Sequence, residues 1–344
     1  RPPRSTLSSS SAASDVYKRQ DTTYYLNELK NELNRQFYKD GTNFEGSSHY
    51  SAFTTEALII FKLSLDVIEP DSSLIELIEK LVFSNRRLLN LLMVNGELSQ
   101  IGDNDSGRLF YFYHDEDDPL KMDWLINLID HFFNFENENS IEVPNLKNDP
   151  IDLTNFSKVD HPLIKIFQND FNLYTFPDFG IFIWRNNDGS EYFSVRCGQI
   201  GQNGVGGHAH YDQLSIECFT EGKWIARDPG TGTYTDDIKT RNEFRSMKFH
   251  WGPNADIKFP KESEFDCFKL NYMEDGKLLF LDKNNFLGSA VFNGNKIYRK
   301  IVIENGNILI SDFSNDTNLN PYENWGELNE GVKFKFSKGY KRIN

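Results

Sequence analysis

Apolar residues in the first half of the chain recur at the spacing of helices. Residues 22–34 carry leucines on one face, and residues 51–67 are apolar on nearly every side, which indicates a helix buried between neighbours. Ser73 begins a capping-box pattern, so we expect a third helix from there to about Val94. A fourth helix is expected over residues 120–135. The first half is therefore predicted to be a set of antiparallel helices joined by loops.

The period of the pattern changes to two further along the chain. Residues 136–157 are rich in Asn, Asp, Glu and Pro, and we interpret them as a linker. Beyond them the apolar positions alternate over residues 180–185, 192–196 and 214–218, as in β-strands. Turn formers recur between the runs, at residues 187–189, 221–222, 274–276, 293–295 and 305–307. This predicts an antiparallel sheet domain, a large β-sandwich that reaches the end of the chain and includes a strand over residues 332–336.

Residues 1–20 share no composition with the rest of the chain. They have neither an apolar core nor a cleavage-site pattern, so they are not interpreted as a signal peptide. The run resembles a translated sequencing adapter, with residues 10–20 matching adapter DNA in one reading frame. We therefore expect the native sequence to begin upstream of Asp21, with the helical part cut short.

The chain is acidic, with a formal net charge of −14 at pH 7. This charge disfavours binding to nucleic acid, which attracts basic patches, and to an anionic membrane. It also disfavours a polyanionic sugar unless basic side chains gather in the cleft. No apolar run approaches about 18 residues, the length of a membrane span. Three widely spaced cysteines make a disulfide framework an unfavourable interpretation.

A glycine-rich run over residues 204–215 holds His208 and His210. On an extended segment, His-x-His places both imidazoles on one face. Asp228 and His250 follow, and imidazole nitrogen and carboxylate oxygen are usual ligands of zinc. A metal site is one interpretation, and two half-exposed strand histidines are the other. If the Glu-Gly turn signal closes a two-residue hairpin, Asp228 does not lie opposite His210, so a metal site requires a β-bulge or a crossing between sheets.

Five motifs resemble the heparinase II/III-like polysaccharide lyases. Two lie in the helical half, Asp-Gly-Thr-Asn-Phe-Glu-Gly-Ser-Ser-His-Tyr over residues 40–50 and Gly-Asp-Asn-Asp-Ser-Gly-Arg over residues 102–108. Three lie in the sheet half, Gly-Gly-His-Ala-His-Tyr-Asp-Gln-Leu-Ser over residues 206–215, Asp-Pro-Gly-Thr-Gly-Thr-Tyr-Thr over residues 228–235 and Arg-Asn-Glu-Phe-Arg-Ser over residues 241–246. They occur in the family's order.

The resemblance implies an α+β fold in which a partial α/α toroid is followed by a large antiparallel β-sandwich. We accordingly divide the chain into a non-native tail (1–20), a partial α-helical toroid domain with linker (21–157) and a heparinase II/III-like C-terminal β-sandwich domain (158–344). The resemblance further implies an enzyme that cleaves a uronic-acid-containing, anionic polysaccharide by β-elimination. Degradative relatives imply the periplasm or cell envelope as its location, and relatives from biosynthesis loci imply the cytoplasm.

β-Elimination requires neutralisation of the uronate carboxylate, a base for the C5 proton and an acid for the O4 leaving group. The resemblance implies that Tyr50 and His208 transfer the protons, and that His210, Asp228 and His250 bind a structural zinc near the active site. The family's carboxylate-neutralising Asn has no counterpart in this sequence. Since a phenol has a reference pKa of about 10, we expect a nearby cation to lower the pKa of Tyr50. The structural alternatives are packing of Tyr50 on the linker and a hydrogen bond of His208 beneath the site.

Other polar residues are expected to contact the substrate. Arg241 and Arg245 lie four residues apart, and a guanidinium group matches a uronate carboxylate bidentately; ion pairs on the acidic surface are the alternative. The family commonly has His after the reactive tyrosine, where this chain has Ser51, so His49 is interpreted either as taking that role or as a surface residue. The loop over residues 103–108 is interpreted either as reaching the cleft or as turn chemistry only.

Two other functions fit parts of the pattern. A relative from an exopolysaccharide biosynthesis locus would bind a polysaccharide without catalysis or with a different reaction. A metal-stabilised β-sandwich that binds glycan would account for the histidines but not for Tyr50. Formation of an unsaturated uronate product separates an elimination enzyme from both.

Overall fold

The structure, a computed structural model, describes residues 23–343 apart from 69–72, 111–117, 134–145, 148–150, 168–169, 261–265 and 326–335. The tail over residues 1–20 lies outside this part of the chain. The predicted strand over residues 332–336 also lies outside it, except for Phe336, which is in no strand.

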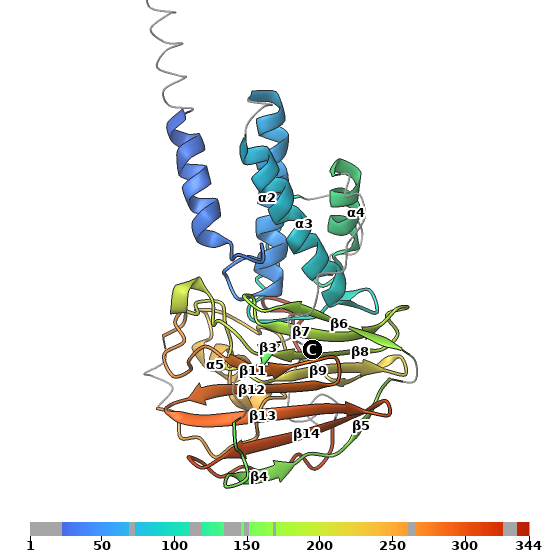
Figure 1. The fold of residues 1–344 in the computed structure, drawn as a ribbon. Helices are drawn as coiled ribbons and strands as arrows, with labels where there is room; N and C mark the ends of the chain where they lie inside the picture. Colours follow the sequence, from blue (N-terminus) through green and yellow to red (C-terminus); the bar gives the residue numbers. More distant parts are fainter. Residues whose placement is uncertain are drawn as a thin grey trace, which may run out of the picture.

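Helices come first along the chain (Figure 1). They span residues 23–36, α2 (Ser48–Ile68), α3 (Ser73–Leu92) and α4 (Asp123–Phe132), so the four predicted helices are present, with α4 shorter than predicted. The predicted end of α3 is wrong by two residues. Met93–Val94 (β1) and Glu97–Leu98 (β2) form a hairpin instead, because Asn95 and Gly96 adopt φ values of 50° and 77°, which suit a two-residue turn.

Two antiparallel sheets follow the helices. One has five strands in the order β10-β9-β8-β7-β6; the other has seven, in the order β3-β11-β12-β13-β14-β4, with β5 also paired to β14. In chain order the strands are β3 (Leu146–Lys147), β4 (Ser157–Asp160), β5 (Ile164–Lys165), β6 (Phe171–Phe176), β7 (Ile181–Asn186), β8 (Tyr192–Arg196), β9 (Ile216–Thr220), β10 (Lys223–Ala226), β11 (Lys277–Leu281), β12 (Asn285–Phe292), β13 (Asn295–Glu304) and β14 (Asn307–Ser314). The predicted alternating runs are thus β7, β8 and β9. Part of the predicted linker is a strand, because β3 pairs with β11.

The five-stranded sheet is the middle of three layers, between the helices and the seven-stranded sheet (Figure 1). Strand β7 shows why. Ile181 and Ile183 belong to the apolar core that the helices share, whereas Phe182 and Trp184 belong to the core between the two sheets. All four side chains are buried. A strand that alternates between two cores is apolar throughout, and the result is an α+β fold with a C-terminal β-sandwich.

A buried ion pair connects the seven-stranded sheet to the segments that carry the histidines. Arg299 of β13 binds both carboxylate oxygens of Asp312 of β14, at 2.7 Å each. Its Nη1 also donates to the carbonyls of Leu214 and Trp251, at 2.7 and 2.8 Å. Burial raises the pKa of Asp312, but Arg299 and His161 outweigh it and hold that pKa at about 2. Because the two carbonyls belong to the histidine-carrying segments, this charged group fixes both from beneath.

The three cysteines are free thiols, and Cys197 and Cys218 are buried. This agrees with the expectation of no disulfide framework. Within the described ranges, no helix is both long and apolar enough to cross a bilayer.

Candidate active site and metal centre

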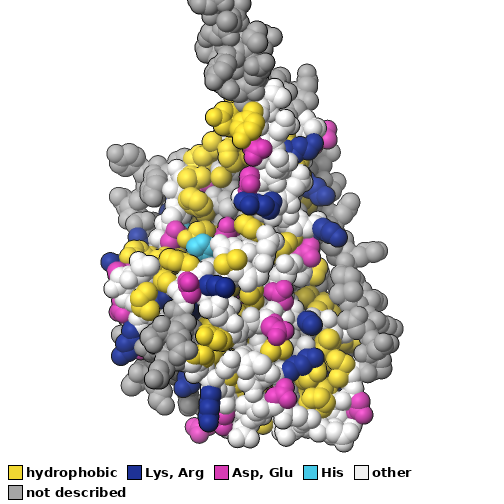
Figure 2. All heavy atoms as spheres, turned by 90° about the vertical axis from the view of Figure 1, so that its left-hand side faces the viewer, with side chains coloured by type: hydrophobic (Ala, Val, Ile, Leu, Met, Phe, Trp, Pro, Cys, Tyr) yellow, Lys and Arg dark blue, Asp and Glu magenta, His cyan; other side chains and the backbone are white. Residues whose placement is uncertain are grey.

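Three loops meet where the helices join the five-stranded sheet. The start of α2 is tied to the loop after β2 by a hydrogen bond from Ser48 N to Ile101 O at 3.0 Å, and the loop after β2 is tied to the histidine loop by one from Asp103 N to His208 O at 2.9 Å. Gly102 has φ of 63°, and a Cβ there would collide with the carbonyl oxygen of His208 and lie 2.8 Å from that of Gly46. Only glycine lets the three backbones approach this closely. Figure 2 shows a histidine side chain at the surface below the hydrophobic face of the helices.

Tyr50 and His208 come from opposite sides of this junction and stack on each other. Their ring centroids lie 3.8 Å apart, with 21° between the ring planes. Tyr50 stands in the first turn of α2, and its hydroxyl donates to Asp105 Oδ2 at 3.0 Å. Burial, and then the negative charge of Asp105, raise the pKa of Tyr50 above its usual 10. The shift is opposite to the expected one, because the phenol is buried and the charged group beside it is an anion.

His208 lies between two carboxylates. Its Nδ1 is 3.2 Å from Asp103 Oδ2, and its Nε2 is 3.7 Å from Glu45 Oε2. An ionised carboxylate only accepts, so the ring carries its proton on Nδ1 and directs Nε2 toward Glu45. The side chain remains 17% exposed, which leaves one edge of the ring open.

Asp103 is the most heavily bonded carboxylate of the junction. It is fully buried, and Arg241 binds both of its oxygens, through Nη1 to Oδ1 and through Nη2 to Oδ2 at 2.7 Å. Oδ1 also accepts from His210 Nε2 at 2.9 Å, and Oδ2 from His208 Nδ1. Burial alone would raise the pKa of Asp103; Arg241 and the two imidazoles outweigh it and hold the pKa below its usual range. Asp103 is therefore ionised and binds both histidines of the His-x-His pair.

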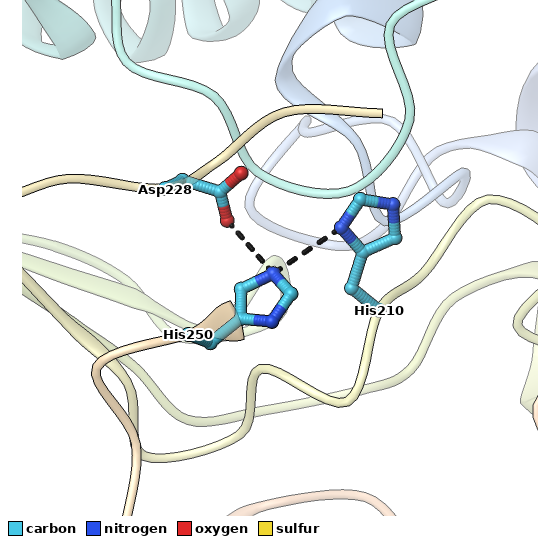
Figure 3. Close-up of side chains that lie close together, drawn as sticks. All are labelled: His210, Asp228 and His250. Atoms are coloured by element: carbon cyan, nitrogen blue, oxygen red, sulfur yellow. Dashed lines mark hydrogen bonds and ion pairs between the residues drawn. The ribbon is translucent and has the colours of Figure 1, made fainter. Parts of the chain in front are cut away.

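His210, Asp228 and His250 converge on one point (Figure 3). Nδ1 of His210 lies 3.3 Å from Nε2 of His250, which lies 3.1 Å from Asp228 Oδ2. Their candidate ligand atoms all lie within 4.8 Å of one another, and all three residues are buried. In a regular hairpin with a two-residue turn, Asp228 would not lie opposite His210. The two residues meet because β10 has a β-bulge between Trp224 and Ala226, and because the histidine loop precedes β9 rather than belonging to it.

The hydrogen bonds of the outer ring nitrogens of His210 and His250 determine whether the inner nitrogens, which face the point of convergence, carry a proton or a lone pair. Nε2 of His210 donates to Asp103, and Nδ1 of His250 donates to the carbonyl of Ser246 at 2.8 Å. In neutral rings the inner nitrogens would then present lone pairs to each other across 3.3 Å. A positive charge between them, a proton or a metal ion, removes that repulsion. Metal-bound histidines commonly donate their other N–H in this way, so the donor set fits a divalent ion.

The three residues predicted to contact the substrate lie in the interior of the structure. Arg241 is 0% exposed and Arg245 1%, because the first neutralises Asp103 and the second donates to the carbonyls of Asp266 and Cys267. His49 is 2% exposed, with Nε2 3.1 Å from the carbonyl of Gly107. None of the three side chains faces solvent.

Other residues of the site were missed or undervalued by sequence reasoning. Asp103 and Asp105 are predicted only as part of a loop that either reaches the cleft or is turn chemistry, and Glu45 only as part of a motif. Tyr234 lies beside Tyr50, and the guanidinium carbon of Arg241 is 5.1 Å from the centre of its ring. Burial, and then Asp103 and Tyr50, raise the pKa of Tyr234. The available signal was the Gly-Asp-Asn-Asp-Ser-Gly motif, since a glycine before a carboxylate often marks a close backbone approach.

Comparisons with known proteins support the resemblance. Residues 170–250 match the family described as Heparinase II/III-like, C-terminal. The chain is similar to the heparan sulfate lyase HepC from Pedobacter heparinus, at 14% identity and a TM-score of 0.50, over 82% of this chain and 40% of that one. It is also similar to heparinase III, at 15% identity and a TM-score of 0.53, over 86% of this chain and 44% of that one. No curated protein matches the sequence.

These matches establish the fold of the chain and the family resemblance of one part of it. At such identities the likeness to solved structures shows the fold, and the chain spans less than half the length of those structures. The family match covers the strands from β6 to the segment that ends at His250. The resemblance to heparinase II/III-like proteins is confirmed for that part of the chain.

The buried His49 gives the protein a specific acid sensitivity. Burial lowers its pKa from the usual 6.5 to about 4, against the opposing effect of Asp105. The unfolded chain therefore binds a proton at this residue between about pH 6.5 and pH 4 that the folded protein does not bind, so stability falls as the pH falls through that window. We expect the His49→Gln variant to lose less unfolding free energy than the wild type between about pH 7 and pH 5, by on the order of 1–3 kcal/mol, measured by urea denaturation. Equal losses in the two proteins would contradict a neutral buried His49.

Proposed function

We propose that this chain, which carries a heparinase II/III-like C-terminal domain, belongs to a polysaccharide lyase that cleaves an anionic, uronic-acid-containing polysaccharide by β-elimination. The observation that carries the proposal is the stacking of Tyr50 on His208 at 3.8 Å, with one residue from each side of the junction. A phenol and an imidazole in contact at an open edge are the two proton-transfer groups that this reaction needs.

The protonation states favour distinct roles for the two residues. His208 holds a proton on Nδ1 against Asp103, so in the neutral ring Nε2, which lies 3.7 Å from Glu45 Oε2, has the lone pair that would take the C5 proton of the uronate. Burial and the charge of Asp105 raise the pKa of Tyr50, so the phenol keeps its proton and is the group of the pair that has one to give to the O4 leaving group. Asp105 accepts a hydrogen bond from that hydroxyl and orients it. We therefore assign His208 as the base and Tyr50 as the acid.

The predicted substrate-binding residues act from the interior in this proposal. Arg241 neutralises Asp103, and Arg245 anchors the backbone of the neighbouring segment, so both support the site rather than contact the uronate. His49 packs beneath the loop of Asp105. The group that neutralises the uronate carboxylate is not assigned to any residue of the described part of the chain.

We further propose zinc as the metal and a toroid as the helical architecture. Two imidazoles and a carboxylate, His210, His250 and Asp228, form a zinc-like donor set, and an ion there would hold the histidine loop to the sheet. Helices α2 and α3 pack against each other across a short connection, as successive helices of an α/α toroid would. This keeps the division into a partial toroid with linker (21–157) and a β-sandwich (158–344).

The Tyr50→Phe variant tests the reaction. It removes only the hydroxyl, so we expect the rate of elimination to fall by at least about 10²-fold while the free energy of unfolding changes by less than about 1 kcal/mol. The readout is ultraviolet absorbance of the unsaturated product formed from a panel of uronate polymers. Tyr25→Phe, at an exposed position on the first helix, is the matched control. Wild-type turnover by Tyr50→Phe would contradict the role of the phenol. A wild-type protein that binds a uronate polymer without forming unsaturated product would favour the binding-protein alternative.

The His210→Ala variant tests the metal. Removing one ligand should abolish stoichiometric zinc and lower the melting temperature by roughly 5 °C or more, because an ion bound only to the folded state stabilises it. Zinc is measured by elemental analysis of tag-free protein, and melting by calorimetry. His131→Ala, at an exposed helix position, should change neither. Wild-type protein without zinc after purification in zinc-containing buffer would contradict the metal assignment.

A further inference from the structure

We propose that Asp103 couples the metal site to the imidazole of His208, so that it acts as a positioning residue for both histidines of the His-x-His pair. The inference rests on the proposed function only for the catalytic role of His208. The coupling itself is a property of the buried hydrogen bonds and is measurable without substrate.

The coupling is direct because one carboxylate group serves both rings. Oδ1 accepts from His210 Nε2 at 2.9 Å, and Oδ2 accepts from His208 Nδ1 at 3.2 Å. A carboxylate is rigid and planar, so a rotation that follows one ring displaces the oxygen that binds the other. His210 in turn directs its remaining nitrogen at the metal position. A change at that position therefore reaches His208 through two hydrogen bonds and one carboxylate.

The carboxylate has little freedom to absorb such a change. Arg241 binds both oxygens in fork geometry, and Asp103 is fully buried. Its backbone is held as well, because its N–H donates to the carbonyl of His208 and its own carbonyl accepts from Ser47 Oγ at 2.6 Å. A group this constrained transmits a displacement instead of relaxing locally.

The two rings use the carboxylate in complementary ways. Donation from Nε2 leaves His210 with Nδ1 for a metal ion, and donation from Nδ1 leaves Nε2 of His208, on the ring stacked against Tyr50, directed toward Glu45 at 3.7 Å. Both tautomers are thus set by Asp103. The same residue lies in the loop after β2, so the helical side of the junction determines the protonation pattern of two histidines on the sheet side.

The experiment follows the ring nitrogens of the histidines by ¹H–¹⁵N NMR in protein labelled selectively at its seven histidines. Spectra of zinc-loaded and chelator-treated wild type are compared. Removal of zinc should shift the signals of His210 and His250, and also those of His208, while those of His131, at an exposed position of α4, stay in place. Unchanged His208 signals in the wild type, or wild-type protein that binds no zinc, would overturn the proposal.

Asp103→Asn separates the carboxylate path from the backbone that links His208 to His210. The amide retains one acceptor oxygen, so we expect zinc affinity, measured by competition with a chromophoric chelator, to fall about 10–100-fold. The response of His208 to zinc removal should be lost. Asp105→Asn, in the same loop but bonded to Tyr50, is the matched control and should retain wild-type zinc affinity. A full His208 response in Asp103→Asn would show that the backbone, not the carboxylate, carries the coupling.

A second variant covers the case in which Asp103→Asn leaves the Arg241 charge unpaired and unfolds the protein. Asp103→Asn combined with Arg241→Met removes the buried ion pair as a unit, which proteins tolerate better than loss of one partner. The same loss of the His208 response is expected. Neither arm uses substrate, so an absence of lyase activity would contradict the proposed function and leave the coupling standing.

Discussion

The site depends on one buried charge that must be balanced from several sides. An ionised carboxylate without exposure is tolerated only when it is paired and fully hydrogen-bonded. Arg241, His208 and His210 supply those bonds to Asp103, and each comes from the sheet side, whereas Asp103 comes from the helical side. The ion pair therefore joins the two sides of the molecule electrostatically, at the place where Tyr50 meets His208.

The histidine loop itself is held from two directions. From above, Asp103 sets the orientation of His208 and His210; from below, Arg299 of β13 donates to the carbonyls of Leu214 and Trp251. The converging set of His210, Asp228 and His250 lies between these supports. A metal there would close the segment from His210 to His250, and a preorganised loop is what the proposed proton transfer at His208 requires.

Local sequence patterns predicted the helices and strands, whereas contacts between residues far apart in the sequence came only from the structure. The alternating run at Tyr192–Arg196 became β8, and the Glu221-Gly222 turn closed the β9–β10 hairpin, because period and turn chemistry are local properties. The contact between Tyr50 and His208 was implied by resemblance alone. No local sequence pattern indicates that Arg241 is buried in an ion pair. Its partner Asp103 lies 138 residues away in the sequence, so an arginine that contacts substrate and one in an internal ion pair have the same local pattern. For the same reason the sequence predicts a lowered pKa for Tyr50, although burial and then Asp105 raise it.

The most direct test of this account is a crystal structure with anomalous diffraction data collected at the zinc edge. We expect an anomalous peak about 2 Å from Nδ1 of His210, Nε2 of His250 and a carboxylate oxygen of Asp228, with Asp103 bound to the opposite nitrogen of His210 and to Nδ1 of His208. A crystal grown with zinc that shows no peak at this position, or one in which His210 turns Nδ1 toward Asp103, would contradict it.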